Sequence, residues 1–262
     1  MNNITKVVLI TASTGIGAAT AKVLGAQGWK IFVASLSPEH VNALIQELKR
    51  VGIEADGIAC DISMPESPSL IINKCLDSFG RIDALYNVAG VSGRKDGDGS
   101  LEKCTDEGWQ TVLDINLTSQ FRMCRVVVKH WLKEPEKYNG KIKSILNMAS
   151  ILGVDPMPEY FDTLAYGVSK AAVIGMSKIL ASTYASDGVS VNTIAPGLVE
   201  TPMSTRASQD PRILSAVGRK QRLSKGMVPI DTVAKLSAFM LSDGCISMTG
   251  EVVHPDGGWR VS

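Results

Sequence analysis

The sequence is poor in the residues that mark several whole classes of protein. Aromatic residues make up 5% of its 262 residues, and it has three histidines and five cysteines. The cysteines are odd in number and form no C-x-x-C pair, so their spacing indicates neither a disulfide framework nor a zinc site. The histidines are equally isolated, and we therefore expect no bound metal. These residues are Cys60, Cys75, Cys104, Cys124 and Cys245, with His40, His130 and His254.

An excess of charge of either sign is also missing. The chain has 27 Lys and Arg against 26 Asp and Glu, a net charge of +1. This balance lacks the electrostatic footprint expected of a nucleic-acid or anionic-membrane partner. No apolar run approaches the length of a membrane span, and the start from Met1 to Lys6 has none of the features of a signal peptide. We therefore expect a soluble, cytoplasmic protein whose partner is a small molecule.

What the sequence does have is a high apolar content in a regular pattern. Hydrophobic residues make up 45% of the chain, enough for a substantial core. Short apolar runs alternate with longer segments of helical period, which predicts βαβ units on a parallel sheet. No linker or internal repeat divides the chain, so we expect one domain over residues 1–262. The predicted strands cover 6–10, 30–34, 55–59, 84–88, 144–148, 189–194 and 250–253, and the predicted helices cover 15–27, 38–51, 67–79, 109–132 and a segment through 166–185.

Tyr166 and Lys170 form the most informative pair in the chain. Four residues apart on a predicted helix, they lie one turn apart on the same face. A tyrosine with a pKa of about 10 is a poor base at neutral pH. An ammonium a few ångströms away favours the phenolate and lowers that pKa, so we expect Tyr166 to exchange protons near neutral pH. The bare pair also occurs on ordinary amphipathic helices, and it needs support from other residues.

A glycine-containing turn joins the first predicted strand to the first helix. Gly15 and Gly17 let backbone N–H groups approach a pyrophosphate, and the helix N-terminus adds partial positive charge. Turns of this kind also occur without a ligand in many α/β proteins. The position of this one, directly after an N-terminal strand, favours a dinucleotide.

Further segments, in matching order and spacing, give the chain a resemblance to a known family. From about residue 6 to residue 259 it resembles the short-chain dehydrogenases/reductases. Besides the Tyr/Lys pair, the matching segments are Asn87-Val-Ala-Gly90, Pro196-Gly-Leu-Val-Glu-Thr-Pro-Met203 and Asp61. The resemblance implies an α/β fold with a Rossmann-type doubly wound parallel sheet of about seven strands and helices on both faces. It also implies an NAD(P)-dependent oxidoreductase acting on CH–OH or C=O groups.

One part of the family pattern is altered. The family's turn reads Thr-Gly-x-x-x-Gly-x-Gly, and Thr11 stands where its first glycine is expected. Because Thr11 lacks the conformational freedom of glycine, we expect the pyrophosphate turn to be slightly reshaped.

The resemblance assigns cofactor contacts to particular positions. Asp61 is expected at the adenine edge, the Asn87 to Gly90 segment under the ribose, and Val199 and Thr201 at the nicotinamide carboxamide. The full set of expected cofactor residues is Thr11, Ser13, Thr14, Gly15, Ile16, Gly17, Ser35, Leu36, Ser37, Asp61, Ile62, Asn87, Ala89, Gly90, Tyr166, Lys170, Pro196, Gly197, Val199 and Thr201.

The resemblance also implies a catalytic set of Asn116, Ser150, Tyr166 and Lys170. Ser150 would hydrogen-bond the substrate carbonyl oxygen, although a capping or turn serine would look the same in sequence. Asn116 would perturb its helix and hold a water that feeds protons to Lys170; otherwise it is a polar helix residue. In the implied mechanism, hydride passes from nicotinamide C4 to the carbonyl carbon while Tyr166 donates a proton to the oxygen. Lys170 would also hold the nicotinamide ribose hydroxyls.

Two segments near the implied substrate site leave alternatives open. Family members commonly place about a dozen residues between the serine and the tyrosine, and this chain has a few more, in the proline-containing segment 155–161. That insert lines the substrate mouth, decorates the surface or contacts another subunit. The segment 204–227 carries six basic residues against one acidic residue. It favours an anionic or phosphopantetheine-bearing substrate, or it is a mobile, solvated loop.

The choice of dinucleotide depends on the end of the second strand. No acidic residue stands near Ser35 to grip a ribose 2′-hydroxyl, so nothing there repels a 2′-phosphate. The positions where NADP-specific relatives usually carry arginine hold Leu36 and Thr14, while Ser35 and Ser37 offer hydroxyls. The pattern favours NADP(H) over NAD(H).

The sequence leaves open alternative functions, several substrate classes and the kind of oligomer. A non-catalytic dinucleotide sensor would share the fold but should lack the Tyr/Lys/Ser set, and a methyltransferase has no need of it. The fold alone does not choose among 3-oxoacyl thioesters, polyols, sugars and steroid-like alcohols as substrates. The resemblance implies a homotetramer or homodimer, with residues 126–128 and the tail from Pro255 to Trp259 compatible with buried contacts.

Overall fold

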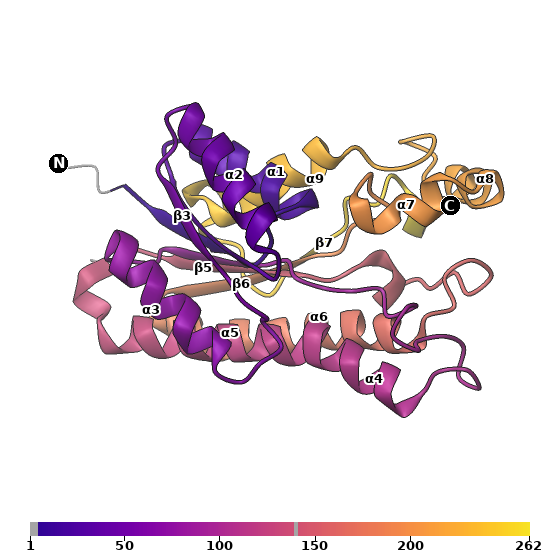
Figure 1. The fold of residues 1–262 in the computed structure, drawn as a ribbon, viewed down its shortest axis with the longest axis horizontal. Helices are drawn as coiled ribbons and strands as arrows, with labels where there is room; N and C mark the ends of the chain where they lie inside the picture. Colours follow the sequence, from indigo (N-terminus) through magenta and orange to yellow (C-terminus); the bar gives the residue numbers. More distant parts are fainter. Residues whose placement is uncertain (1–4, 139–140) are drawn as a thin grey trace.

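The computed structural model describes residues 5–138 and 141–262, and its centre is a parallel sheet of seven strands (Figure 1). The strand order is β3-β2-β1-β4-β5-β6-β7, and every neighbouring pair is parallel. This is the expected doubly wound architecture. The strands are β1 (Val7–Ile10), β2 (Lys30–Ser35), β3 (Ala55–Ala59), β4 (Ala84–Asn87), β5 (Lys143–Met148), β6 (Val189–Ile194) and β7 (Val252–Val253).

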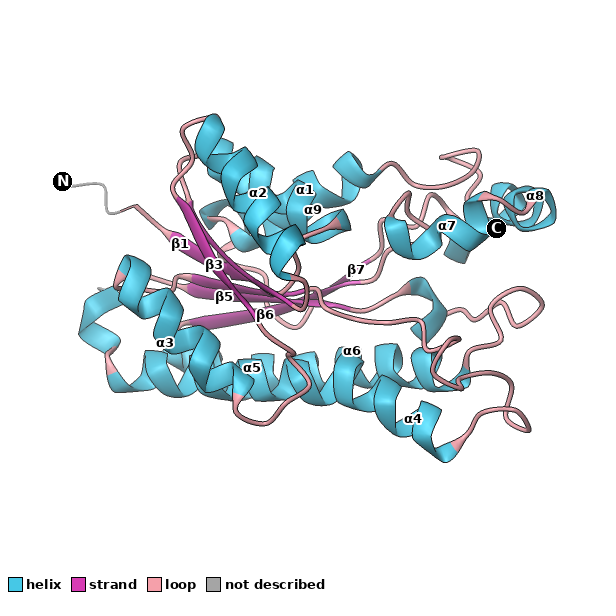
Figure 2. Cartoon of the chain, in the orientation of Figure 1, coloured by secondary structure: helices cyan, strands magenta, loops and turns pink. Residues whose placement is uncertain are grey.

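Helices cover both faces of the sheet, as Figure 2 shows. On one face lie α1 (Gly15–Ala26), α2 (Pro38–Arg50) and α9 (Ile230–Leu241), and on the other lie α3 (Ser67–Phe79), α5 (Ser119–Lys133) and α6 (Leu164–Tyr184). The short helix α4 (Asp106–Leu113) packs beside α6. Two further helices, α7 (Thr205–Ser208) and α8 (Pro211–Lys220), form one end of the molecule together with the C-terminus.

The central strands are buried along their length because both faces of the sheet are covered, although β5 and β6 also carry polar residues such as Asn147 and Asn192. Every residue of β1, β4, β5 and β6 is buried. Alternate side chains enter two separate cores, since successive residues of a strand point to opposite faces. Val8 and Ile10 of β1 join the core under α1, α2 and α9, whereas Val7 and Leu9 join the core under α3 and α5.

Local signals begin and end the helices at the observed residues. The Ser37 hydroxyl accepts from the His40 N–H at the start of α2, with Pro38 at the first helical position. Thr105 caps α4 in the same way through the Gly108 N–H. Gly80 ends α3 in the left-handed region, with φ of 74°.

Three helical features differ from the sequence-based expectation. The helix predicted over 109–132 begins at Asp106 and contains a π-helical segment, Asp114–Thr118, between α4 and α5. The segment 204–227 contains α7 and α8, so the interpretation of it as a loop throughout was wrong: apolar residues of α8 are buried against the insert. Helix α9, on the opposite face from α6, was not predicted.

The carboxyl edge of the sheet is where a ligand is expected. The strand order reverses between β1 and β4, and in sheets of this type ligands bind outside the carboxyl ends of the strands at such a point. The turn after β1, the Asn87–Gly90 segment after β4, Ser150 after β5 and the Pro196 loop after β6 all leave from this edge.

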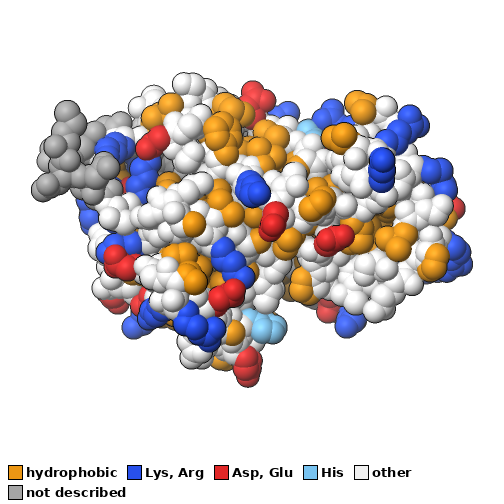
Figure 3. Space-filling model, turned by 90° about the horizontal axis from the view of Figure 1, so that it is seen from above, with side chains coloured by type: hydrophobic (Ala, Val, Ile, Leu, Met, Phe, Trp, Pro, Cys, Tyr) orange, Lys and Arg blue, Asp and Glu red, His pale blue; other side chains and the backbone are white. Residues whose placement is uncertain are grey.

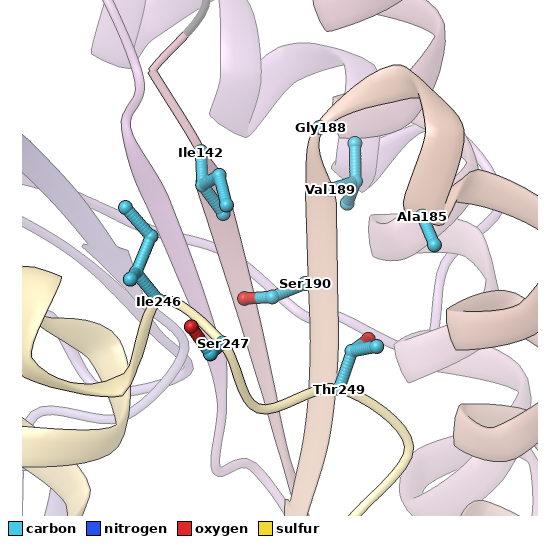
Figure 4. Close-up of a pocket in the computed structure, with 8 residues that line it drawn as sticks. All are labelled: Ile142, Ala185, Gly188, Val189, Ser190, Ile246, Ser247 and Thr249. Atoms are coloured by element: carbon cyan, nitrogen blue, oxygen red, sulfur yellow. The ribbon is translucent and has the colours of Figure 1, made fainter.

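A small cavity at the opposite edge carries no such chemistry. It has a volume of about 110 Å³ and lies at the amino-terminal end of β6. Figure 4 shows Ile142, Ser190 and Ser247 facing its space. Its walls are apolar and hydroxyl side chains and glycine backbone, without a titratable group. We therefore place the functional site at the carboxyl edge.

Candidate active site

Helix α6 brings Tyr166 and Lys170 to the carboxyl end of β5. The Lys170 Nζ lies 5.6 Å from the centre of the Tyr166 ring and donates to the Met148 carbonyl, at 3.1 Å. Ser150 follows Met148 by two residues and approaches the Tyr166 phenol. Ser150 also caps the turn Ile151–Gly153 by accepting from the Leu152 N–H at 3.2 Å, so its capping interpretation is confirmed and its catalytic role stays a prediction.

Close backbone contact fixes the serine segment against α6. A Cβ built on Gly153 would lie 2.6 Å from the Ala171 nitrogen and 2.7 Å from the Lys170 carbonyl carbon. Since real Cβ atoms essentially never approach so closely, only glycine allows this contact. The turn after Ser150 therefore packs directly on the backbone that carries Lys170.

Asp98 is a site residue that the sequence did not reveal. Its carboxylate is 7% exposed and accepts from the Ala165 N–H at 3.0 Å and from the Tyr166 N–H at 2.9 Å. It thereby satisfies two of the N–H groups that the first turn of α6 leaves without helical partners. Asp98 lies far from α6 in sequence and has no motif, so only the fold brings the two together.

The expectation for the Tyr166 pKa was wrong in direction. Burial raises the pKa of the Tyr166 phenol, and the interaction with Ser150 opposes this only in part. Lys170 is itself 2% exposed, and burial lowers its pKa to about 8. Desolvation disfavours the charged form of both groups, and it is the largest cause of each shift. The neutral phenol remains a proton donor at neutral pH.

We expect the buried Lys170 to make stability depend on pH. The unfolded chain keeps this proton up to the ordinary pKa of 10.5, whereas the folded chain releases it above about 8. Between these values the unfolded state binds more protons, so the free energy of unfolding rises with pH. From pH 7 to pH 9.5, wild type should gain about 2 kcal/mol relative to Lys170→Met. Urea unfolding of both proteins at the two pH values measures this, and a constant difference would contradict it.

Asn116 lies in the π-helical segment and is fully buried. Its Oδ1 accepts from the Val91 N–H at 2.8 Å, and its Nδ2 donates to the Val91 carbonyl at 3.0 Å and to the Ser169 hydroxyl at 3.2 Å. The side chain thus ties the segment after β4 to α6. A π segment inside an α-helix often marks a functional site.

The turn after β1 has the shape of a phosphate cradle. Gly15 has φ of 55°, in the left-handed region. A Cβ on Gly17 would lie 2.7 Å from the Ala12 Cβ and 2.8 Å from the Ala12 carbonyl oxygen, so the turn closes directly on the start of α1. The Ser13 hydroxyl is buried here without a hydrogen-bond partner in the described structure. Thr14 precedes α1 in an extended conformation, and Ile16 packs on the neighbouring core.

Thr11 does not reshape this turn in the way we expected. Its N–H continues the sheet by donating to the Tyr86 carbonyl at 3.0 Å, and its φ is not positive. The Thr11 Oγ1 accepts from the Val88 N–H at 2.9 Å and from the Ala89 N–H at 3.3 Å. Thr11 therefore takes the place of the threonine that opens the family's turn, and the turn is one residue shorter.

We expect this hydroxyl to contribute measurably to stability. Thr11→Val keeps the shape of the side chain but leaves two N–H groups without their acceptor, which costs about 1–3 kcal/mol. Thr11→Ser keeps the acceptor and serves as the matched control. Chemical unfolding of the three proteins tests this; equal destabilisation by both substitutions would assign the effect to packing instead.

The segments after β4 and β6 complete the edge. A Cβ on Gly90 would lie 3.1 Å from the Asn116 Oδ1 and 3.3 Å from the Lys170 Nζ, so this glycine adjoins both catalytic candidates. A Cβ on Gly15 would lie 3.8 Å from Thr201 and Pro202, which places the Pro196 loop beside the phosphate turn. The Asn87 side chain points from the sheet toward α5, where its Nδ2 donates to the Asn147 Oδ1 at 2.8 Å and to the Cys124 Sγ at 3.3 Å.

Comparison with known proteins agrees with this geometry. A family model described as enoyl-(acyl carrier protein) reductase matches residues 10–260. The chain belongs to the short-chain dehydrogenase/reductase family. It is accordingly an oxidoreductase that acts on CH–OH or C=O groups, and its seven-stranded sheet is the Rossmann-type sheet of that family.

Individual relatives in this family cover nearly the whole chain. The 3-oxoacyl-[acyl-carrier-protein] reductase FabG of Escherichia coli is 32% identical over 98% of both chains. The 3beta-hydroxysteroid dehydrogenase 1 of Eggerthella lenta is 32% identical over 97% of this chain and 93% of its own length. A variant of the actinorhodin polyketide ketoreductase, solved with NADPH, has a TM-score of 0.85 at 29% identity and covers 98% of both chains.

The end of β2, where the family resemblance leads us to expect the adenosine, lies beside an acidic residue that sequence reasoning missed. At the start of α2, the Ser37 hydroxyl donates to the Glu39 Oε2 at 2.7 Å, which lowers the pKa of Glu39. Leu36 is 71% exposed beside it. Asp61 lies at the end of β3, where its Oδ1 accepts from the Ser63 N–H at 2.9 Å. One of the two serine hydroxyls considered for a 2′-phosphate is therefore already engaged by a carboxylate.

The segments that we expected to be compatible with buried subunit contacts are largely buried within this chain itself. Val127 and Val128 are buried in this chain's own core under the sheet, and Val126 packs against it. Trp259 is 1% exposed and packs in a small core with the insert and α8. These residues are therefore occupied within the chain.

Proposed function

We propose that this protein is an NADPH-dependent reductase of ketone substrates, with residues 1–262 acting as one catalytic domain. The observation that carries the proposal is the meeting of Tyr166, Lys170, Ser150 and Asn116 at the carboxyl edge of β5, beside the phosphate turn. A sensor without catalytic activity has no need of a buried lysine against a tyrosine ring.

The site residues fit a nicotinamide dinucleotide. The Gly15–Gly17 turn and the unpartnered Ser13 hydroxyl would hold the pyrophosphate, and Lys170 the ribose of the nicotinamide. When bound, the dinucleotide supplies a hydride to the substrate carbonyl. The remaining expected contacts, at Ile62, Ala89, Gly90, Pro196, Gly197, Val199 and Thr201, lie along the same edge.

Residues of the chain then bind the carbonyl oxygen of the substrate and transfer a proton to it. Ser150 donates a hydrogen bond to that oxygen, which holds it within reach of Tyr166. Tyr166 passes its phenolic proton to the oxygen as negative charge develops there, and its raised pKa keeps that proton available at neutral pH. Lys170, through its own charge, stabilises the phenolate that remains. Asn116 holds the segment after β4 against α6 and so fixes this geometry.

The preference for NADPH rests on the end of β2. Neither Ser35 nor Leu36 offers a carboxylate to a ribose 2′-hydroxyl, and the actinorhodin ketoreductase relative was solved with NADPH. Glu39 acts against the preference, since its charge would repel a 2′-phosphate. Fluorescence titration with both dinucleotides tests the proposal: NADPH should bind more tightly, and tighter binding of NADH would reverse it.

The substrate proposal follows the relatives named above, which include a 3-oxoacyl thioester reductase and a hydroxysteroid dehydrogenase. We propose a 3-oxoacyl thioester as the first substrate to test, ahead of polyols, sugars and steroid-like ketones. The experiment is NADPH oxidation with a panel drawn from these four classes. Turnover of any one class supports the reductase function and names the substrate class, and turnover of another class in place of the thioester would overturn the choice of a 3-oxoacyl thioester. Dinucleotide binding without turnover of any class would instead support a non-catalytic sensor.

We also propose a cytoplasmic homo-oligomer that associates through α6. The expectation that no apolar run approaches the length of a membrane span was wrong by length and composition alone, since the helix Leu164–Asp187 meets both criteria. This helix nevertheless packs on the sheet and carries the Tyr166 and Lys170 pair. Only 33% of the most apolar stretch of this helix is buried within the chain, and the side chains of Val168 and Ile179 are 40% and 68% exposed. Burial against a second copy would cover this surface. Sedimentation of wild type and of Ile179→Glu tests it: wild type should be a dimer or tetramer, and the variant smaller.

A further inference from the structure

Two guanidinium groups meet on one carbonyl oxygen at the mouth of the site. Arg94 follows the Asn87–Gly90 segment, and Arg206 lies in α7 after the Pro196 loop. The Nη2 of each donates to the Tyr160 carbonyl at 3.1 Å. Tyr160 belongs to the insert that precedes α6. The chain segments that leave β4, β5 and β6 toward the substrate therefore converge on this one oxygen.

Around the Tyr160 carbonyl, the positive charges of the described side chains are not all matched by carboxylates. Asp162 lies 2.9 Å from the Arg94 Nη2. Among the side chains that the structure describes, none of the carboxylates forms an ion pair with Arg206 within 4.0 Å, although the charges of Asp162 and Asp210 act on it from farther away. By contrast, two other basic residues of the same end are matched, Arg212 with Asp210 and Lys220 with Asp155. Arg94 and Arg206 share Asp162, and Asp210 is paired with Arg212, so a positive charge remains that an anion would stabilise.

The second arginine, Arg206, is exposed to solvent, and it also lies against an aromatic ring. Its guanidinium carbon lies 5.9 Å from the centre of the Phe161 ring, which favours a cation over the ring face. Phe161 in turn packs against Trp259, with ring centres 6.5 Å apart, in the small core that joins the insert to α8. A guanidinium has five N–H donors in a planar fork that matches a carboxylate or phosphate. Each arginine uses only one nitrogen on Tyr160.

The contacts of this pair lie on the chain segment directly before the reacting group. Asp162 precedes Tyr166 by four residues, which spans at most about 14 Å of chain. Lys and Arg side chains also gather over the end of the molecule that α7 and α8 form (Figure 3). This field would raise the local concentration of an anionic substrate at the mouth.

We propose that Arg94 and Arg206 form an anion-binding subsite, and that the substrates are ketones that carry a carboxylate or phosphate away from the reacting carbonyl. The inference rests on the proposed ketone reductase function and names its substrate class. The anion is either a carboxylate of the substrate itself or a phosphate of the carrier to which a thioester is attached. Both sources share the chemistry that the two arginines recognise.

The test compares charged and neutral forms of the same ketone. One arm uses 3-oxobutanoate, 5-oxohexanoate and 7-oxooctanoate, each with its methyl ester. The other uses the acetoacetyl thioester of coenzyme A, which has phosphates, against that of N-acetylcysteamine, which has none. Wild type should prefer the charged member of at least one pair by about tenfold or more in kcat/KM, which corresponds to about 1.4 kcal/mol. The pair with the largest preference identifies the source of the anion.

Variants then assign the preference to the two arginines. Arg94→Gln and Arg206→Gln should each remove most of the preference while leaving kcat/KM for the neutral ketone within about twofold. Arg212→Gln removes a positive charge already matched by Asp210 and is the control for the general field. If kcat/KM falls equally for charged and neutral ketones and the melting temperature also falls, the two arginines only stabilise the fold, and the proposal is overturned. A preference that is absent in wild type or equally reduced in the control would also overturn it.

Failure of this inference can be told from failure of the proposed function. Turnover of the neutral ketones without any preference for charge would keep the reductase and remove the anion subsite. If no ketone is reduced, binding of 3-hydroxybutanoate and inorganic phosphate is measured by calorimetry on wild type and Arg206→Gln. Binding that the variant weakens would retain the subsite without the reductase, and equal or absent binding would remove both.

Discussion

Tyr166→Phe is expected to lower kcat by about 10²–10⁴-fold, the range that a positioned general acid contributes. The substitution removes only the phenolic oxygen, so the ring can stay over the Lys170 Nζ and the start of α6 can stay capped by Asp98. Dinucleotide binding should therefore change by no more than about twofold. Steady-state rates with the ketone that wild type reduces best, together with fluorescence titration of NADPH, separate the two quantities.

Tyr184→Phe makes the same change at the far end of the same helix and is the matched control. Tyr184 packs against the core under the sheet, far from the catalytic edge along α6. We expect it to keep wild-type rates. A Tyr166→Phe enzyme that retained more than about a tenth of wild-type turnover would remove this phenol as the proton donor.

Gly17→Ala is expected to weaken dinucleotide binding by about 30-fold or more, because the added carbon has no room. It would lie 2.7 Å from the Ala12 Cβ and 2.8 Å from the Ala12 carbonyl oxygen, so the turn and the first residues of α1 must separate. That displacement moves the N–H groups that would face a pyrophosphate, and each charge-assisted hydrogen bond is worth about 1.5–3 kcal/mol. The measurement is the dissociation constant for NADPH by fluorescence titration.

Gly175→Ala supplies the control for adding a methyl group to a helical glycine. A Cβ at Gly175 meets nothing within 4 Å, so the change should leave NADPH binding unaltered and stabilise α6 by about 0.5–1 kcal/mol. Unaltered binding by both variants would show that the turn after β1 does not hold the dinucleotide.

The architecture was largely predictable because its signals are local and repeated. Each of the seven strands was expected within a residue or two of its observed bounds, since buried parallel strands are continuous apolar runs. The phosphate turn and the Tyr/Lys pair were found because their function requires fixed spacing along one segment. Helices α8 and α9 were not predicted because no motif lies in either of them. Only the structure shows that their apolar residues pack against the insert and the sheet.

The missed parts of the site depend on contacts between distant segments. Asp98 caps the helix of Tyr166 from a loop that follows β4, and nothing in its own neighbourhood distinguishes it from any surface aspartate. The Tyr166 pKa was misjudged because spacing alone shows that a lysine is near but not that both groups are buried. The motif alone predicts that Thr11 replaces a glycine, because the hydrogen bonds that show its role come from N–H groups of the segment after β4.

The small core around Trp259 has a consequence for anyone who wishes to redesign this enzyme. It is assembled from the insert, α7 with α8, and the C-terminal tail, with the Trp259 indole donating to the Asp155 carbonyl at 3.2 Å. Grafting any one of these pieces from a relative would leave apolar side chains facing a surface that no longer fits them. The three pieces form one transplantable unit, and chimeras with new selectivity should exchange them together.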